Sequence, residues 1–363
     1  MENIPDNLPA LRDRIDDIDT EILKLLARRV ECALEIGEIK KTINKPFFDP
    51  ARERQVFDRL RQRNEEIGSK LSNKNISVIY REIISACRNA EHPLCVAFLG
   101  PAGTNTQQAA VNYFGSAFDA LPCGTVEEVC REAGREADYG VLAIENSTHG
   151  IVAPTLDLLA DHDLTICAEI ALPIHFCLLS QSALGEISTV YSHEQGLAQC
   201  RKWLAAHIPS AALVPVTSTA RGAQLAAEEK YSAAIGTSIA AEIYGLQIVA
   251  ANIEDLATNK TRFFVVGAQD KAPAASGKDK TSLTFLVPHR PGALLEILSC
   301  FSKHDINLSM IESRPTRQQM WEYRFFADVQ AHRSDPALQA ALEELKDHTV
   351  SYKILGSYPE SSG

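Results

Sequence analysis

The sequence predicts a multidomain protein, in which an all-helical segment is followed by an α/β region with two lobes and then by a small α+β domain. Three observations carry this prediction. Residues 1–92 contain no convincing strand and show helical periodicity. Residues 94–269 alternate short apolar strands with helical stretches, which is typical of α/β domains. After a polar linker at 270–280, residues 281–359 follow a βαββαβ order.

The composition is that of an ordinary globular protein, with 363 residues, 45% hydrophobic and 23% charged. No run approaches the ~18 apolar residues of a membrane span, and the first ten residues lack the features of a signal peptide. A net charge of −11 without a basic stripe argues against a nucleic-acid partner. The nine cysteines are scattered without a CxxC pair, so we expect reduced thiols in the cytoplasm and no metal site.

The helical segment is organised around one long helix, which spans about residues 8–43. Its apolar positions recur in steps of three and four, the heptad pattern of a helix packed on other helices. They are Leu11, Ile15, Ile18, Ile22, Leu25, Cys32, Ile36, Ile39 and Ile43. Arg29 and Lys40 fall about 20° apart, inside this apolar stripe. Because unpaired buried cations are costly, either acidic residues neutralise them or the helix holds an anionic ligand.

Two shorter helices are expected to follow. Pro46 ends the connection, and the second helix starts at Asp49 or Pro50, since proline is tolerated in the first turn. Asn73 or Asn75 is the expected cap of the third helix. The first helix would be about 50 Å long at ~1.5 Å per residue. Two short helices cannot cover it within one monomer, so we expect dimerisation about the long helix.

Spacing alone leaves two interpretations of the two cations open. Glu53 lies on the inner face of the second helix, and Glu91 extends the inner face of the third. Buried salt bridges Arg29–Glu53 and Lys40–Glu91 would therefore satisfy both cations. A bound dianion would satisfy them as well.

The charged positions of residues 8–92 resemble those of the all-helical chorismate mutase family. The resemblance rests on the pattern Leu11-Arg12-x-x-Ile15, Ala27-x-Arg29, Gly37-x-x-Lys40 and Asp49-x-x-Arg52-Glu53-Arg54. It implies a dimer with two equivalent sites, in which Arg29 and Arg12 of the partner subunit bind the carboxylates of chorismate. It further implies that Lys40 donates to the ether oxygen and that Glu53 holds the ring hydroxyl, with Asp49 and Arg52 nearby.

The chemistry that this resemblance implies explains the residue types. A Claisen rearrangement needs a flexible dianion held in its reactive fold and donors where charge grows on the breaking C–O bond. Two positions depart from the family, which often has serine where this chain has Cys87 and glutamine where it has Glu91. Only the protonated acid of Glu91 can donate. We therefore expect mutase activity to fall as the pH rises and Glu91→Gln to flatten this dependence, and a decayed mutase is an alternative.

The α/β region is expected to contain strands at 95–99, 139–144, 164–171, 175–180, 189–192, 233–236 and 263–267. Polar segments at the strand ends place hydroxyls and backbone N–H groups at helix starts, which suits carboxylates. No GxGxxG, Walker A or HExxH pattern is present, so we expect no cofactor.

A series of motifs in this region resembles the prephenate dehydratase family. They are Gly100-Pro-x-Gly-Thr104, Glu145-Asn-Ser, Tyr191-Ser-His, Ser218-Thr-Ala220, Tyr244-Gly-Leu246 and Asn259-x-Thr261-Arg262-Phe263. The resemblance implies two lobes with a cleft, similar to periplasmic solute-binding proteins. It implies that Thr261 hydrogen-bonds or protonates the departing hydroxyl, and that Arg262 pairs with a carboxylate or anchors the loop. The remaining cleft residues are expected to be Asn146, Ser147, Ser192, Thr219 and Phe263. Loss of CO₂ and hydroxide restores an aromatic ring, so the reaction needs mainly orientation and a donor.

The C-terminal domain is expected to have strands at 282–287, 306–312, 322–328 and 352–355 and helices at 292–303 and 336–347. Two of its motifs resemble the ACT regulatory domain of prephenate dehydratases: Gly292, Ala293, Leu294 and Leu295, and Glu312, Ser313, Arg314 and Pro315. The resemblance implies an L-phenylalanine site between paired domains, to which Asn307 and Leu308 add contacts. The alternative is a ferredoxin-like structural module.

Together these resemblances imply a bifunctional cytoplasmic enzyme, a homodimer or a higher homo-oligomer. It would convert chorismate to prephenate and prephenate to phenylpyruvate, CO₂ and water, under inhibition by L-phenylalanine. The alternative function is a non-catalytic sensor of amino acids or other carboxylates. A sensor needs neither cations in an apolar stripe nor the Thr261 hydroxyl at its cleft.

Overall fold

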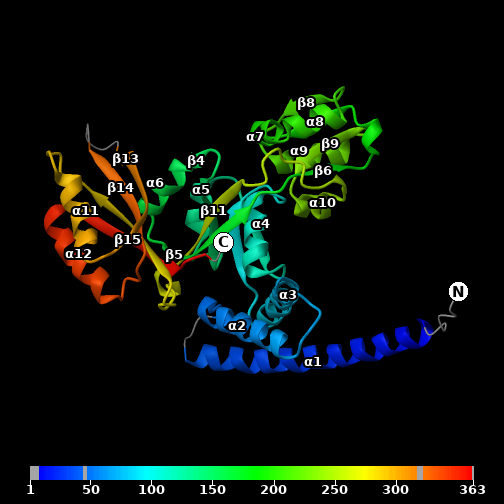
Figure 1. Cartoon of the computed structure of the whole chain (residues 1–363), viewed down its shortest axis with the longest axis horizontal. Coiled ribbons are helices and arrows are strands. Elements are labelled where there is room, and N and C mark those ends of the chain that lie inside the picture. The colour runs from blue at the N-terminus through cyan, green and yellow to red at the C-terminus, as the bar shows by residue number, and fades with distance from the viewer. Residues whose placement is uncertain (1–7, 44–46, 317–321, 362–363) are drawn as a thin grey trace. The chain divides into compact units, whose positions relative to one another are not determined.

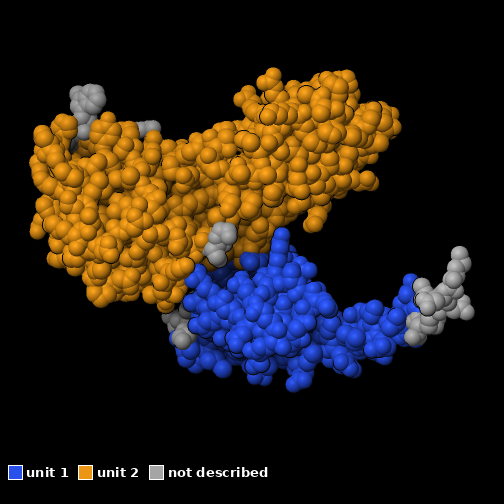
Figure 2. Space-filling model, in the orientation of Figure 1, with its two compact units in different colours: residues 1–94, 114–119 blue, residues 95–113, 120–363 orange. Residues whose placement is uncertain are grey.

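The computed structural model describes residues 8–43, 47–316 and 322–361, so the expected turn at Pro46 lies outside the described residues. The chain separates into two compact units, coloured separately in Figure 2. Residues 1–94 and 114–119 form unit 1, and residues 95–113 and 120–363 form unit 2. None of the described helices is long and apolar enough to cross a membrane.

Unit 1 contains the three predicted helices. They are α1 (Leu8–Thr42), α2 (Pro50–Glu66) and α3 (Asn73–Glu91) (Figure 1). Asp49 caps α2 and accepts a hydrogen bond from the Arg52 N–H, with Pro50 in the first turn, as predicted. The expected cap of α3 is wrong, because Ser72 accepts from the backbone N–H of Asn75. Serine caps as well as asparagine does, and the helix therefore begins one residue after it.

Helix α1 is mostly exposed within the single chain. Gly37 is its one buried residue among those described. Ile15 and Ile18 of the apolar seam are 56% and 52% exposed. A Cβ at Gly37 would lie 2.6 Å from Glu91 Cγ, so this glycine allows the end of α3 to approach α1 one turn from Lys40.

Unit 2 begins with two sheets that form the α/β region. The first has the order β2-β1-β3-β11-β5, with β4 paired to β3, and the second has the order β10-β6-β9-β7-β8. The strands of the first sheet are β1 (Cys95–Leu99), β2 (Asp119–Cys123), β3 (Tyr139–Asn146), β4 (Gly150–Ile151), β5 (Thr165–Pro173) and β11 (Lys260–Gly267). Those of the second sheet are β6 (Cys177–Ser180), β7 (Thr189–Ser192), β8 (Ala212–Pro215), β9 (Ser232–Gly236) and β10 (Gln247–Ala250).

The chain crosses from the first sheet to the second after β5 and returns through β11, which gives the predicted two lobes. The helices of this region are α4 (Asn105–Phe114), α5 (Val126–Glu132), α6 (Ala153–Asp161), α7 (Glu194–Gln199), α8 (Arg201–His207), α9 (Thr219–Glu228) and α10 (Ser238–Tyr244), with a short 3₁₀ turn η1 (Leu184–Glu186). Strand β11 lies between β3 and β5, so it is central to the first sheet. A central strand is held on both sides, which fixes the side chains that it presents.

The C-terminal domain has the predicted βαββαβ order. Its sheet is arranged β13-β14-β12-β15. The elements are β12 (Asp279–Leu286), α11 (Ala293–Lys303), β13 (Leu308–Pro315), β14 (Tyr323–Val329), α12 (Pro336–His348) and β15 (Ser351–Pro359), and a short 3₁₀ turn η2 (Gln269–Lys271) precedes them. Helices α11 and α12 cover one face of this sheet (Figure 1). From the other face Phe326, Leu355 and Tyr358 join the apolar core of the first α/β sheet, so the two domains share one core.

Candidate active sites

A cavity of about 550 Å³ lies among the three helices of unit 1. All three helices contribute to its lining, which comprises Arg29, Cys32, Ala33, Ile36, Lys40, Phe47, Asp49, Arg52, Glu53, Val56, Arg59, Leu60, Tyr80, Ile84, Cys87, Arg88 and Glu91. Arg29 and Lys40 therefore face a shared concave space rather than open water. This arrangement is the one that an anionic ligand requires.

Lys40 is held in place by two contacts. Its ammonium lies 2.8 Å from Glu91 Oε1 and donates to the Phe47 carbonyl at 2.7 Å. The Lys40–Glu91 salt bridge anticipated from the spacing is therefore present, and the Glu91 side chain is only 7% exposed. An ammonium has three N–H donors, so one donor of Lys40 remains for a ligand in the cavity.

The other anticipated salt bridge, Arg29–Glu53, is wrong. Glu53 Oε1 lies 2.5 Å from Nη1 of Arg88, a residue that the sequence analysis did not select. Burial raises the pKa of Glu53, and Arg88 opposes this shift. Arg88 is buried, its guanidinium packs 4.9 Å from the centre of the Phe48 ring, and its Nη2 donates to the Phe114 carbonyl. Arg29 has no ion pair among the described residues, so its guanidinium is available to a ligand.

The remaining predicted mutase residues are split by the structure. Asp49, Arg52 and Cys87 line the cavity, with Cys87 buried and the other two exposed at its rim. Arg12 does not line it and lies exposed on the N-terminal part of α1. This placement leaves Arg12 free to serve a site other than the one in its own chain.

A second cavity, of about 600 Å³, lies between the two lobes of the α/β region. The first sheet, the starts of helices α4, α6 and α9, and helix α7 of the second lobe contribute to its lining, which comprises Leu99, Thr104, Asn105, Thr106, Ala143, Asn146, His149, Gly150, Ile151, Val152, Ala153, Pro154, Ile174, Phe176, His193, Gln195, Gly196, Gln199, Thr217, Ser218, Thr219, Asn259, Thr261 and Phe263. The predicted residues Asn146, Thr219, Thr261 and Phe263 are thus brought together.

A hydrogen-bond network fixes Thr261 in this cleft. Asn146 Nδ2 donates to Thr261 Oγ1 and to Asn259 Oδ1, both at 2.9 Å. Asn259 Nδ2 donates to Gln199 Oε1 at 3.0 Å, which links the first lobe to α7 of the second. Because Thr261 accepts from Asn146, its own hydroxyl proton remains for an acceptor in the cleft. Gln199 was not selected from the sequence, because no periodicity marks a polar residue at the end of a short helix.

Ser147 and Ser192 do not line the cleft, contrary to expectation. Ser147 Oγ accepts from the Lys260 N–H, so it ties β3 to β11 beside the cavity. Ser192 is fully buried and donates to the Ile235 carbonyl at 2.9 Å. Its hydroxyl is therefore used for joining β7 to β9.

Arg262 also points away from the cleft, so its expected role as a carboxylate partner there is wrong. Successive side chains of a strand face opposite sides, and Thr261 and Phe263 occupy the cleft side of β11. The Arg262 guanidinium instead lies 2.7 Å from Glu169 and 2.6 Å from Asp328. Within the described lining of the cleft no Lys, Arg, Asp or Glu occurs, and the ionisable side chains there are His149 and His193.

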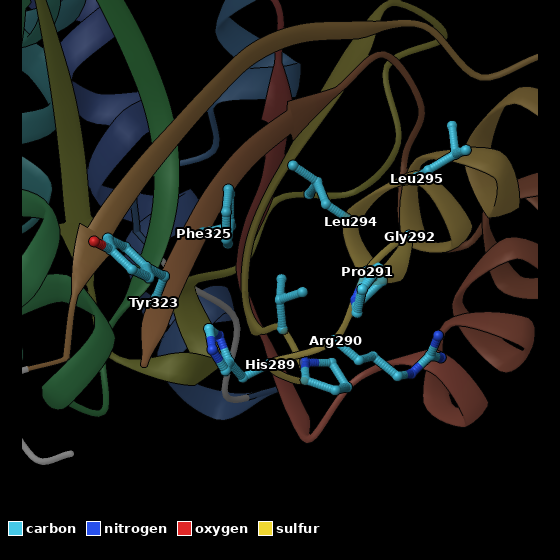
Figure 3. Close-up of a pocket in the computed structure, with 11 residues that line it drawn as sticks. His289, Arg290, Pro291, Gly292, Leu294, Leu295, Tyr323 and Phe325 are labelled. Atoms are coloured by element: carbon cyan, nitrogen blue, oxygen red, sulfur yellow. The ribbon is translucent and has the colours of Figure 1, made fainter. Parts of the chain in front are cut away.

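A third cavity, of about 650 Å³, lies in the C-terminal domain (Figure 3). Its lining contains the first of the two predicted effector motifs: Val287, Pro288, His289, Arg290, Pro291, Gly292, Ala293, Leu294, Leu295, Tyr323 and Phe325. Gly292 has a φ of 84°, which a side chain would strain, and it starts α11. Arg290 precedes α11 and donates two hydrogen bonds to Glu296 of that helix, at 2.7 and 2.5 Å.

The second predicted effector motif does not line this cavity in the single chain. Glu312, Ser313, Arg314 and Pro315 lie on β13, and Arg314 Nη2 is 3.3 Å from Asp157 of α6. Asn307 and Leu308 are likewise outside the cavity, with Asn307 donating to Gln330 at 2.8 Å. The two motifs therefore do not form one site within one copy of the domain.

Three family models match consecutive parts of the chain. Chorismate mutase type II matches residues 11–92, prephenate dehydratase matches 96–271, and the ACT domain matches 281–347. Two solved structures resemble unit 2. A quorum-quenching acylase named GqqA aligns with a TM-score of 0.69 at 29% identity, covering 74% of this chain and 98% of its own. Prephenate dehydratase from Arthrobacter aurescens, solved in complex with L-Phe, aligns with a TM-score of 0.68 at 36% identity, covering 74% of this chain and 90% of its own.

Full-length relatives join all three parts in one chain. The bifunctional chorismate mutase/prephenate dehydratase of Aquifex aeolicus is 43% identical over 359 residues, which cover 98% of this chain and 99% of that protein. The helical cavity with its cations and the two-lobed cleft with its threonine fall in the matched mutase and dehydratase regions. The chain therefore belongs to the family of bifunctional chorismate mutase/prephenate dehydratases.

Proposed function

We propose that this protein rearranges chorismate to prephenate in unit 1, and converts prephenate to phenylpyruvate, CO₂ and water in the α/β cleft of unit 2. The observation that carries the proposal is the presence of two separate cavities with different chemistry. One presents cations to a dianion, and the other presents a hydroxyl donor in a cleft without fixed charges. L-phenylalanine acts through the C-terminal domain.

In the mutase cavity, Arg29 binds one carboxylate of chorismate and Lys40 donates its remaining N–H to the ether oxygen. The rearrangement needs no nucleophile, because bonds break and form within one folded dianion. Charge that grows on the ether oxygen is met by a cation already held in place by Glu91 and Phe47. Arg12 of the partner subunit binds the second carboxylate, and Glu53 holds the ring hydroxyl, with Asp49 and Arg52 at the rim.

This assignment requires a homodimer or a larger homo-oligomer. Arg12 does not reach the cavity of its own chain, and the apolar seam of α1 that carries Ile15 and Ile18 is exposed there. A second copy packed along α1 would cover this seam and bring Arg12 to the neighbouring cavity. None of the nine cysteines, which all lie in the described residues, forms a disulfide within the chain, and this suits a cytoplasmic setting.

In the dehydratase cleft, Thr261 donates a hydrogen bond from its hydroxyl to the leaving hydroxyl of prephenate and keeps its proton. Asn146 and Asn259 hold this hydroxyl in one orientation. The carboxylates of prephenate are met by backbone N–H groups at the starts of α4 and α9 and by His149 and His193, since Arg262 is directed elsewhere. The C–C bond to the ring carboxylate breaks and its electron pair enters the ring as the C–O bond breaks. CO₂ and hydroxide leave, the ring becomes aromatic, and the hydroxide takes up a proton from solvent to give water.

The cleft favours dehydration over acyl transfer. A hydroxyl nucleophile for acyl transfer is usually activated by a hydrogen-bonded imidazole. In the described part of the cleft, the Thr261 hydroxyl accepts a hydrogen bond from Asn146, and the Ser218 hydroxyl accepts one from the Arg221 N–H. Neither hydroxyl is hydrogen-bonded to a histidine side chain there.

The effector site is completed by two copies of the C-terminal domain. Gly292, Ala293, Leu294 and Leu295 contribute the cavity of one copy. The segment from Glu312 to Pro315, with Asn307 and Leu308 nearby, comes from the partner subunit, since it lies outside the cavity of its own chain. The N–H groups at the start of α11 suit the carboxylate of an amino acid.

Two variants of the full chain test the proposal. Lys40→Ala is expected to lower chorismate turnover by about 10²–10³-fold and to leave prephenate dehydration intact, because it removes one preorganised donor. Thr261→Ala is expected to do the reverse. Both products are followed separately, from chorismate and from added prephenate, with and without L-phenylalanine. Loss of both activities in either folded variant would reject two separate sites, and a wild-type chain without turnover that still binds L-phenylalanine would favour the sensor.

A further inference from the structure

Arg262 lies beside the proposed dehydratase donor and contacts a different domain. In the register of β11 with β5, Arg262 is paired with Ala171, and Glu169 lies two residues along β5 on the same face. Its Nε donates to Glu169 Oε2 at 2.8 Å, and its Nη2 lies 2.6 Å from Asp328 Oδ2 of β14. The same Nη2 donates to the Tyr358 hydroxyl of β15 at 3.1 Å. One guanidinium thus joins the strand of Thr261 to two strands of the C-terminal domain.

The C-terminal partners of Arg262 are rigidly held. Asp328 and Tyr358 are fully buried. Ser282 donates to Asp328 Oδ1 at 2.5 Å and lies 2.6 Å from the Tyr358 hydroxyl. A carboxylate and a hydroxyl that are fixed in this way hold Arg262 in one orientation, since its planar fork loses little freedom on binding.

The charges around Arg262 are balanced, and we call Arg262, Lys280, Glu169 and Asp328 the buried ion cluster. Lys280 of β12 lies 2.9 Å from Glu169 Oε1 and 3.6 Å from the partly exposed Glu360. Burial alone would raise the pKa of Glu169, but Arg262, a hydrogen bond from the Ser361 N–H and Lys280 together outweigh it and the pKa is lowered. Burial also raises the pKa of Tyr358, so this hydroxyl keeps its proton. The cluster is therefore a fixed set of charges at neutral pH.

A close backbone contact supports the same junction. A Cβ at Gly356 of β15 would lie 2.3 Å from the Ile166 carbonyl oxygen of β5. Only glycine allows the two backbones to approach so closely. Strands β15 and β5 are thus in direct contact where β5 pairs with β11.

The strand that carries Asp328 also lines the cavity of the C-terminal domain. Tyr323 and Phe325 of β14 face that cavity, and Asp328 follows three residues later on the same strand. Figure 3 shows both rings on the side of the cavity opposite the start of α11. A change in the cavity that moves β14 therefore moves the carboxylate that holds Arg262.

We propose that Arg262 is a positioning residue of the dehydratase, which fixes the backbone at Thr261 through its bond to Asp328 and transmits the state of the C-terminal domain to the cleft. This inference rests on the proposed dehydration at Thr261. Arg262 touches no part of the cleft, so its loss changes where the Thr261 hydroxyl lies and not how many groups bind the substrate. The catalytic rate constant kcat should therefore fall, whereas the KM for prephenate should change little.

The test compares Asp328→Asn and Arg262→Lys in the full chain with prephenate as substrate. Both are expected to lower the dehydratase kcat by about tenfold, since a shift of ~1 Å at a reacting group costs up to ~10²-fold. The KM for prephenate is expected to stay within about twofold. The concentration of L-phenylalanine that halves activity is expected to rise several-fold, whereas chorismate turnover in unit 1 stays unchanged.

A matched control removes another ion pair between the same two domains. Asp161→Asn abolishes the contact of Asp161 with Arg324 at 2.9 Å, which does not involve β11. It is expected to leave kcat and phenylalanine inhibition as in the wild type. Ser282→Ala, which loosens Asp328 without removing a charge, is expected to give a smaller effect in the same direction as Asp328→Asn and serves if that variant does not fold.

Three outcomes would overturn the inference. The first is a folded Asp328→Asn variant with unchanged kcat and intact phenylalanine inhibition. The second is an Asp328→Asn variant in which only the KM for prephenate changes. The third is an Asp161→Asn variant whose kcat and inhibition change as much as those of Asp328→Asn. Additive effects of Arg262→Lys and Asp328→Asn in the double variant would also contradict it, because residues that act through one bond are not additive. A wild-type chain that fails to dehydrate prephenate would instead reject the proposed function.

Discussion

Replacement of Glu91 by glutamine tests whether the Glu91 side chain faces the ether oxygen of bound chorismate. Glu91 is buried, lies 2.8 Å from Lys40 and faces the cavity that we assign to chorismate. A carboxylate there repels the charge that grows on the breaking C–O bond, whereas the protonated acid or an amide donates to it. Wherever Glu91 carries its charge, the wild-type mutase should therefore be slower than Glu91→Gln, whose amide has no charge to repel the ether oxygen.

The magnitude follows from the value of one preorganised donor. Such a donor is worth about 10²–10³-fold in rate. At the alkaline end of the profile, Glu91→Gln should therefore exceed the wild type by roughly 10- to 100-fold. Lys40 keeps its bond to the Phe47 carbonyl in this variant, so its position is retained.

The assay measures chorismate disappearance from pH 4.5 to 8 for the wild type, Glu91→Gln and a matched control. Glu38→Gln is that control. It removes the exposed ion pair between Glu38 and Lys41, 2.7 Å apart on α1, the helix that also carries Lys40. An exposed pair contributes about 0.2–1 kcal/mol, so the control should follow the wild-type profile. Parallel profiles for the wild type and Glu91→Gln would refute the assignment of Glu91 to the ether-oxygen side.

Three further predictions concern packing and charge. Gly37→Ala places a Cβ 2.6 Å from Glu91 Cγ, so we expect a loss of ~1–3 kcal/mol in stability and a weaker mutase, and an unchanged urea midpoint would contradict this. Ser192→Ala removes the buried bond to the Ile235 carbonyl, so denaturation should show a loss of about 1 kcal/mol with no change in the KM for prephenate. The pKa of Glu169 is lowered because Arg262, the Ser361 N–H and Lys280 together outweigh burial, so its stabilising effect is complete above the ordinary value of 4.5 and is lost as the pH falls through the lower folded value. Urea titrations should therefore show a steeper loss of stability in acid for the wild type than for Glu169→Gln.

The helices of unit 1 were predictable because each long apolar stripe has a clear period. The Lys40–Glu91 pair followed from the same geometry. The partner of Glu53 did not follow, because periodicity assigns a face to each position and ignores the reach of a long side chain. Arg88 lies one position after the inward Cys87, yet its guanidinium reaches Glu53 across the gap between α3 and α2. Such pairs depend on the distance between helices, which the sequence does not encode locally.

The two-lobed region was predicted in outline, and its weakest strands were missed. Strands β2, β4, β8 and β10 were not expected, since each is short and partly exposed and lacks a continuous apolar run. Ser192 was placed in the cleft because it ends a strand beside a histidine. Alternation along β7 puts its side chain in the core instead, where β9 supplies the acceptor. Position at a strand end therefore predicts nearness to a cleft, and the direction of the side chain has to be argued separately.

The position of Arg262 combines both lessons. The sequence analysis began this strand at residue 263, but β11 begins at Lys260. With the longer strand, alternation alone places Thr261 and Phe263 on one face and Arg262 on the other. Alternation does not identify Asp328 as the partner of Arg262. Asp328 lies 66 residues away, in a domain that packs on the first α/β sheet through a shared apolar core. The side chains of this three-residue motif therefore face two directions: Thr261 lines the cleft, and Arg262 contacts the C-terminal domain. A substitution that removes the Asp328 carboxylate leaves the buried Arg262 guanidinium with one charged partner fewer, so we expect the double replacement of Arg262 and Asp328 to cost less stability than the sum of the two single replacements.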